Sequence, residues 1–408
     1  MKMRFVIPLI LGLSLGFNAV AQEKPAAGPT VRPEVGKPLQ AAIDLLKGKK
    51  PKEALARAKE AQAVPNKTPY ETYLVSRVIG QAAASAGEPA TAAAALESAA
   101  TSSAAPEGER RQLMALAINQ YYSLKEYGKT AALAQRYLQG GADKAMRQIY
   151  VQSLYLGGKF SEAAREIASD IDAEEAAGKK PSEEELQLLA NAYLQAKDTL
   201  HYTRAMEKLV AYYPKRDYWM NVIHSVVSRP GFNERLAIDV ARLKLDVGLM
   251  RTAQEYLDLA QLTMIEGFPA EAVKVIDKGY AAGVLGTGGE AERHKRLKDL
   301  AAKNLAEDKK TLAEQGEKGG AKDGKTLFNE GFNYVLHGRN EKGFAMMQEG
   351  LKQGSGFARV EHARLQLGYA YYLAGQKDRA IQSFKGVTGT DGASALARLW
   401  VIRLSRSS

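Results

Sequence analysis

Glycine-rich segments are the first place where this sequence could hold chemistry, because glycines expose backbone N–H groups that bind phosphate. Residues 283–289 read Gly-Val-Leu-Gly-Thr-Gly-Gly. A phosphate loop follows a strand and ends in a lysine and a hydroxyl residue, whereas Glu290 and Glu292 follow this run and would repel an anion. We therefore interpret the run as a turn between two helices.

The side chains that most often bind metals or act as nucleophiles show no functional spacing. The chain contains no cysteine, which excludes disulfides and thiolate metal sites. No serine lies in the glycine-flanked context of a catalytic nucleophile. We therefore expect no catalytic residue, no metal and no cofactor, and we expect that the protein is not an enzyme. The five histidines, none of them spaced as metal ligands on one helix, are His201, His224, His294, His337 and His362.

The N-terminus has the pattern of an export signal. Lys2 and Arg4 are followed by the apolar residues 5–17 and by Ala19-Val20-Ala21, a small-residue cleavage pattern. The apolar run is too short to span a bilayer comfortably. We expect a signal peptide over residues 1–21, a periplasmic location, and no integral membrane span after cleavage.

The chain is basic. Its formal net charge of +11 at pH 7 becomes +9 when Lys2 and Arg4 are removed with the signal peptide. A basic excess favours acidic partners or anionic surfaces, but the acids are interspersed with the bases, which favours a solubilising surface. An exported chain without a basic stripe among stacking aromatics is not expected to bind nucleic acid.

Helical hairpins are the elements that would position binding residues. Near the C-terminus Gly368 lies on one amphipathic run, Gly375 interrupts it, and Ala380 lies twelve positions after Gly368 on a second run. Small residues at these positions let two antiparallel helices approach closely. Comparable pairs recur along the chain: Ala42 and Ala54, Gly80 and Ala92, Ile118 and Thr130, Val151 and Ala163, Ala260 and Ala272, and Gly331 and Gly343.

The spacing of these pairs indicates a repeat. With Ala190 and its more distant partner Ala205 included, the first members are 38, 38, 33, 39, 70, 71 and 37 residues apart. The two large gaps are about twice the others, so each is expected to hide one degenerate repeat. One centres on Ile223, and the other covers a long helix over residues 290–313.

This pattern resembles the tetratricopeptide repeat (TPR) family, whose repeat is a helical hairpin of this size. The resemblance covers most of residues 39–387 and is carried best by Leu367, Gly368, Tyr371, Ala380 and Phe384. It implies an all-α fold, a TPR-like α-hairpin solenoid with a right-handed superhelix of about eight to ten hairpins. The pattern departs from the family at Ile118, Val151 and Ile223, where glycine or alanine is usual.

Breaks in the pattern divide the chain. Ser182, with Glu185 three residues later, predicts a helix N-cap after a charged loop. Trp400, on a short final helix, is expected to cover the last hairpin. A glycine-rich joint is a candidate boundary between the main array and a C-terminal pair of repeats. The expected segments are a proline-rich tether over residues 22–38, a main TPR-like solenoid over 39–315, the flexible joint over 316–325, and the TPR-like pair with its capping helix over 326–408.

In TPR repeats the residue after the small first-helix position tends to face the concave surface, so the resemblance implies a groove lined by amides and aromatics. Carboxamides donate and accept hydrogen bonds, and tyrosines supply stacking area with a polar tip. We hypothesise that the groove holds an extended segment of another protein. Such a polar row is also an ordinary feature of helix faces, and both interpretations stay open. The candidate partner-binding residues are Gln81, Asn119, Tyr122, Gln152, Tyr155, Asn191, His224 and Gln261, and the same register continues through Phe332, Val335, Tyr369 and Tyr372.

These observations favour a non-catalytic periplasmic adaptor or scaffold that binds a protein or peptide partner in the cell envelope. Three stretches also resemble exported TPR proteins associated with TonB-type energy-transduction systems, which implies a partner in outer-membrane nutrient uptake. They are residues 267–272, 292–297 and 396–400. The alternatives are an envelope assembly factor and an accessory subunit of a peptidoglycan-acting enzyme.

Overall fold

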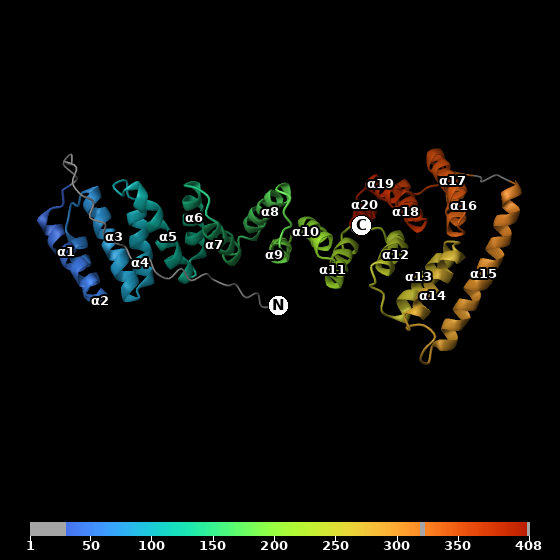
Figure 1. Cartoon of the computed structure of the whole chain (residues 1–408), viewed down its shortest axis with the longest axis horizontal. Coiled ribbons are helices and arrows are strands. Elements are labelled where there is room, and N and C mark those ends of the chain that lie inside the picture. The colour runs from blue at the N-terminus through green and yellow to red at the C-terminus, as the bar shows by residue number, and fades with distance from the viewer. Residues whose placement is uncertain (1–29, 319–322, 406–408) are drawn as a thin grey trace. The chain divides into compact units, whose positions relative to one another are not determined.

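The computed structural model describes residues 30–318 and 323–405, and every regular element in these residues is a helix (Figure 1). The predicted signal peptide, residues 1–21, lies outside the described residues. The described residues form two compact units, residues 30–157 (unit 1) and residues 158–318 with 323–405 (unit 2). Because no helix in the described residues is both long enough and apolar enough, none could cross a membrane.

The helices of each unit follow one another in chain order. Unit 1 contains α1 (Pro33–Lys47), α2 (Pro51–Ala63), α3 (Pro69–Ala86), α4 (Pro89–Thr101), α5 (Glu107–Ser123), α6 (Tyr127–Gln139) and α7 (Lys144–Leu156). Unit 2 contains α8 (Phe160–Ala176), α9 (Glu183–Gln195), α10 (Thr199–Tyr212), α11 (Arg216–Val227), the 3₁₀ turn η1 (Glu234–Leu236), α12 (Ala237–Asp246), α13 (Ala253–Ile265), α14 (Pro269–Ala281), α15 (Ala291–Lys318), α16 (Gly324–Leu336), α17 (Asn340–Gln353), α18 (Val360–Leu373), α19 (Lys377–Lys385) and α20 (Ala393–Ser405).

Consecutive helices pack as hairpins, and the predicted small residues lie where the two helices meet. A Cβ atom added at Gly80 on α3 would lie 2.6 Å from Cγ of Leu96 on α4. One added at Gly368 on α18 would lie 2.6 Å from Cδ1 of Phe384 on α19. Such distances leave no room for a side chain, so these glycines allow the close approach that the sequence predicted. The all-helical, TPR-like hairpin solenoid is confirmed.

Capping boxes start the first helix of three hairpins, α3, α9 and α13. Before α9, the Ser182 hydroxyl accepts a hydrogen bond from the Glu185 backbone N–H at 3.2 Å, and the Glu185 carboxylate accepts one from the Ser182 backbone N–H at 3.1 Å. Two N–H groups that the helix itself cannot satisfy are thereby paired. The predicted N-cap at Ser182 is confirmed.

The N-terminal helix begins earlier than the sequence predicted. Residues 33–38 form the first turns of α1, where an extended tether was expected; the part of that tether before Thr30 lies outside the described residues. Pro33 stands at the first helical position, where its missing N–H costs nothing, and Val35 and Leu39 are buried on one face. An early proline therefore starts this helix rather than preventing it.

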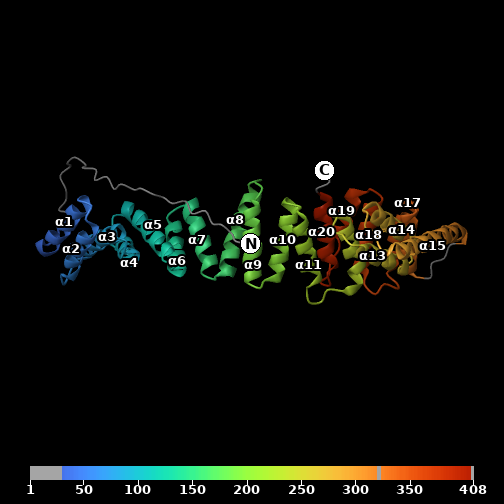
Figure 2. The same cartoon turned by 90° about the horizontal axis from the view of Figure 1, so that it is seen from below.

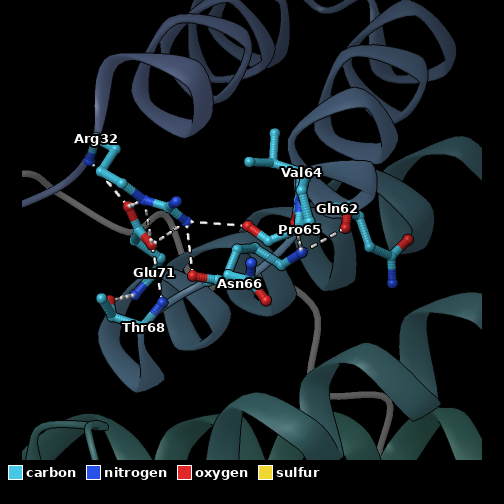
Figure 3. A network of polar contacts seen from close by, with 8 residues as sticks. Arg32, Gln62, Val64, Pro65, Asn66, Thr68 and Glu71 are labelled. Atoms are coloured by element: carbon cyan, nitrogen blue, oxygen red, sulfur yellow. Dashed lines mark hydrogen bonds and ion pairs between the residues drawn. The ribbon is translucent and has the colours of Figure 1, made fainter.

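A polar network joins the start of α1 to the loop before α3 (Figure 3). The Arg32 guanidinium donates to both Glu71 oxygens, at 2.9–3.2 Å, and to the carbonyl of Asn66 at 2.9 Å. The backbone N–H of Thr68 donates to the same carboxylate at 2.8 Å. The hydrogen bonds from Arg32 and Thr68 lower the pKa of Glu71 to about 2. The network fixes the first hairpin against the second one.

The two long gaps between the predicted repeats contain different numbers of helices. Ile223 is buried on α11, which precedes η1 and α12, so this degenerate repeat has two helices as predicted. The long helix predicted over residues 290–313 is α15, a single helix of 28 residues that packs against α14 and α13. One helix therefore stands in this gap where a hairpin was expected.

The C-terminal repeats fold back onto the earlier part of unit 2 (Figure 1, Figure 2). Helix α20 packs against α10, α11 and α12, and α16 packs against α14. Arg398 on α20 donates to the Glu207 carboxylate of α10 at 3.0 Å, and Arg403 donates to Asp246 of α12 at 2.8 Å. The C-terminal repeats therefore contact the array directly. Of the predicted joint over residues 316–325, residues 319–322 lie outside the described residues, residues 316–318 end α15, and residues 324–325 begin α16.

Trp400 holds the C-terminal helix α20 against α18 and α19. It is 1% exposed and stacks on Phe384 with a ring-centroid distance of 5.7 Å, and it also contacts Tyr369 and Tyr372 of α18. Helix α20 thus covers the last hairpin, as the sequence predicted, while its remaining contacts reach α10–α12. Aromatic clusters of this kind contribute strongly to a core because of their buried area.

Candidate functional site

The predicted binding residues of unit 1 lie on α3, α5 and α7. Gln81 and Asn119 are exposed, whereas Tyr122, Gln152 and Tyr155 are half-buried. The Tyr122 hydroxyl on α5 donates to Oε1 of Gln152 on α7 at 3.2 Å. The structure therefore brings together two residues, 30 positions apart, that the register placed on one surface.

Burial affects the protonation of the two tyrosines among these residues, Tyr122 and Tyr155. It raises the pKa of Tyr122, with a smaller contribution from the charge of Tyr127, and it raises the pKa of Tyr155. The Tyr122 and Tyr127 rings meet edge to face at 5.8 Å. Both Tyr122 and Tyr155 therefore remain neutral phenols at physiological pH, suited to hydrogen bonding and stacking rather than to acid–base chemistry.

Gln81 lines a groove between α1 and α3 that the sequence did not predict. The cavity has a volume of ≈ 530 Å³, which is room for a few side chains. Its apolar wall consists of Val31, Leu39, Ile43, Leu46, Leu74 and Val78, and its polar residues include Gln40, Lys47, Arg77, Gln81 and Ser85. Leu39, Ile43 and Leu46 follow helical spacing, which is the signal that could have revealed this wall.

The predicted residues of unit 2 lie on three different helices. Asn191 on α9 is half-buried and accepts a hydrogen bond from Gln195 at 3.5 Å. His224 on α11 is exposed and lies 3.3 Å from the Ser228 hydroxyl. Gln261 on α13 is exposed. Asn191 and His224 thus form these hydrogen bonds with residues of their own helix or of its C-terminal end. Neither hydrogen bond connects one predicted binding residue to another.

Further along unit 2, the same register is buried. Phe332 on α16 is 0% exposed and Tyr369 on α18 is 7% exposed. Val335 is also buried, and the Tyr372 hydroxyl donates to Asp246 on α12. The prediction that this part of the register lines an open groove is wrong, because the returning C-terminal helices fill the space in front of it.

A buried ionic cluster lies in this part of unit 2. Arg242 donates to the two Glu271 oxygens at 2.9 and 2.6 Å and to Asp239 at 3.1 Å. The Tyr369 hydroxyl donates to Glu271 at 3.0 Å. The Arg242 guanidinium also lies 4.7 Å from the centroid of the Tyr369 ring and 5.4 Å from that of Phe332.

Burial dominates the electrostatics of this cluster. It raises the pKa of Tyr369 well above the usual value, and the charge of Glu271 raises it further. Burial also raises the pKa of Asp239, although Arg242 opposes the shift. Removing one member of a buried ion pair typically costs about 3–5 kcal/mol, because the other charge is left without compensation. We conclude that the pairing of Arg242 with Glu271 is a structural feature of unit 2.

The glycine-rich run at residues 283–289 is a turn, as interpreted from the sequence. It connects α14 to α15, and Leu285 within it is 2% exposed and packs into the core. The backbone N–H of Gly286 donates to Nδ1 of His294 at 3.1 Å, so this N–H group is already paired within the chain. Residues 30–318 and 323–405 contain no group of three or more His, Cys, Asp and Glu side chains that could hold a metal ion.

No family model matches this chain, and no curated protein matches it. Among solved structures, yeast Tom70 shares 12% identity, with 91% of this chain and 95% of that chain covered and a TM-score of 0.25. A tetratricopeptide repeat protein from Parabacteroides merdae ATCC 43184 shares 12% identity over 81% of this chain and 99% of that chain, with a TM-score of 0.27. The TPR domain of P58(IPK) shares 11% identity over 91% and 97%, with a TM-score of 0.21. The helical hairpins described above, and not these likenesses, identify the fold.

Proposed function

We propose that this protein is a non-catalytic periplasmic adaptor or scaffold, and that unit 1 binds an extended segment of a partner protein. One observation carries the proposal: the same register is accessible in unit 1, at Gln81 and Asn119, and buried in the C-terminal part of unit 2, at Phe332 and Tyr369. Side chains that are not needed for packing are free to bind a ligand. Exposed carboxamides can pair with both the N–H and the C=O groups of an extended backbone.

The groove between α1 and α3 supports the same function. Its apolar wall and its volume of ≈ 530 Å³ suit one or two apolar side chains of such a segment, and Gln81 stands beside it. Tyr122 and Gln152 continue the surface across α5 and α7. Amides would hold the partner's backbone, and the apolar wall would select its side chains.

The cellular setting of the proposal rests on sequence patterns. The export pattern in residues 1–21 supports a periplasmic location. The resemblance of residues 267–272, 292–297 and 396–400 to TPR proteins of TonB-type systems supports a partner in outer-membrane nutrient uptake. The basic net charge would speed the association with an acidic partner.

The test is capture of an envelope partner by a triple variant, Gln81→Ala, Asn119→Ala and Gln152→Ala. Because these side chains add little to packing, the variant should lose capture while its melting temperature stays nearly unchanged. The matched control replaces three exposed amides on second helices, Gln62→Ala, Gln135→Ala and Gln139→Ala, and should capture normally. Equal capture by both variants would remove the proposed surface, and hydrolysis of purified cell wall by the protein would remove the non-catalytic role.

A further inference from the structure

A second cavity lies within unit 2, between α12, α13, α16 and α18. Its volume is ≈ 530 Å³. The phenylalanines Phe268, Phe328 and Phe357 form part of its wall, and Asp239 and Arg242 also line it. Asp239 is 6% exposed and Arg242 is 3% exposed, so both lie at its buried end, which we call the floor.

The floor carries an excess of negative charge. Arg242 is one cation, and its donors are shared between two carboxylates, those of Glu271 and Asp239. Only Oδ1 of Asp239 accepts from Arg242. Among residues 30–318 and 323–405, no hydrogen bond to Oδ2 of Asp239 occurs, although the side chain is more than nine-tenths buried.

The other charges around the cavity compensate one another. At the exposed rim, Glu234 and Glu266 are matched by Arg235 and Lys325. The remaining two basic residues, Arg359 and His362, both lie at hydrogen-bond distance from Asp391, at 3.2 and 2.9 Å. Burial raises the pKa of Asp239, and the charges of Arg242 and His362 oppose that shift, so only part of the negative charge of the floor remains for a ligand to balance.

We propose that this cavity binds an organic cation, an alkylammonium or guanidinium group, that reaches the free oxygen of Asp239. A buried carboxylate without full compensation is costly, and a cation that enters the cavity removes that cost. Aromatic rings attract cations, so the phenylalanine wall favours the same ligand over a neutral or anionic one. The inference concerns unit 2 and a different ligand chemistry, so it stands apart from the groove of unit 1.

Titration of the full chain with small probes tests this proposal. n-Butylammonium and n-butylguanidinium should bind, and n-butanol and butyrate, which have the same alkyl chain, should not. Asp239→Asn should weaken cation binding by about tenfold or more, because a charge-assisted hydrogen bond is lost. Asp258→Asn, at an exposed acid on α13, makes the same charge change outside the cavity and should leave binding unchanged.

If Asp239 only stabilised the fold, Asp239→Asn would lower the melting temperature. The proposal predicts otherwise. The asparagine oxygen can still accept from Arg242 while the excess charge is removed, so Asp239→Asn should melt no lower than the wild-type protein. A second variant, Phe357→Leu, at a half-buried wall position, should weaken cation binding a few-fold without touching the ionic cluster. The proposal is overturned if the cations bind no better than n-butanol, or if both variants bind like the wild type.

Two further probes distinguish the sources of such a cation. A lysine blocked at both ends represents a side chain of a protein partner, and putrescine represents a free amine. Tighter binding of blocked lysine supports a partner's side chain, and tighter binding of putrescine supports a small-molecule amine. If neither competes with n-butylammonium, the site does not serve an organic cation.

Discussion

Unit 1 and the C-terminal part of unit 2 use the same repeat register in opposite ways. In unit 1, Tyr122 on α5 is half-buried and its hydroxyl meets the amide of Gln152. In unit 2, Tyr369 on α18 is buried and its hydroxyl meets the carboxylate of Glu271. The difference arises because helices α18–α20 pack against helices α10–α14. The side chains that would line an open groove are therefore buried in the core there. A TPR-like register therefore indicates which side chains face inward, but not whether a ligand or the protein itself covers them.

The largest expected effect comes from the ionic cluster of unit 2. Arg242→Ala should destabilise unit 2 by about 3–5 kcal/mol, because Glu271 and Asp239 are left as buried charges. The unfolding transition of unit 1, followed separately in denaturant, should not change. Arg293→Ala removes an arginine whose partner Glu290 is exposed, and it should cost less than about 0.5 kcal/mol. Similar losses in both variants would contradict a buried cluster.

Gly368 should tolerate no side chain. In Gly368→Ala the new methyl group would meet the Phe384 ring at 2.6 Å, and overpacking of this kind costs about 1–3 kcal/mol. Gly128→Ala on α6 is the control, since no atom lies within 4 Å of its Cβ position and alanine favours a helix. Thermal unfolding of both variants measures the difference. An unchanged or raised melting temperature for Gly368→Ala would show that α18 and α19 do not pack this closely.

Two tyrosine variants compare the units directly. Tyr369→Phe removes a buried donor from Glu271 and should cost about 1–3 kcal/mol. Tyr122→Phe removes a half-buried donor to Gln152, whose amide can turn to water, and should cost less than about 1 kcal/mol. Denaturant unfolding measures both losses. If Tyr122→Phe proves the more costly change, the distinction between an open and a filled inner row fails.

The smallest expected effect is the acid sensitivity of the first hairpin. The pKa of Glu71 is lowered from 4.5 to about 2, so its interaction with Arg32 and Thr68 stabilises the folded state above pH 4.5. This contribution is lost as the pH falls toward 2. The stability of unit 1 should therefore decline with acid more steeply in the wild type than in Glu71→Gln, and the two curves should converge at low pH. Parallel curves would exclude Glu71 as the titrating group.

The sequence predicted the local structure well. Helix pairs, the N-cap at Ser182 and the close approach at Gly368 depend on residues near one another in the chain, and helical spacing reveals them. It also placed Tyr122 and Gln152 on a common surface. These features need only one hairpin and its neighbours.

The return of the C-terminal helices could not be predicted in the same way. It depends on contacts such as Arg398 with Glu207, 191 residues apart, and Tyr369 with Glu271, 98 residues apart. Arg242 and Glu271 look like ordinary solvated charges in the sequence, because nothing local shows that they become buried. The burial of Phe332 and Tyr369, and the cavity beside Asp239, follow only from that long-range packing.

Thiol labelling tests the central claim most directly, since the native chain contains no cysteine. The reaction of a maleimide with Asn119→Cys on α5 and with Val335→Cys on α16 compares the inner row of the two units. We predict that the cysteine at position 119 reacts as fast as a free thiol and is protected by a captured partner, whereas the one at position 335 reacts only as unit 2 unfolds. Equal rates in the native protein would contradict the account.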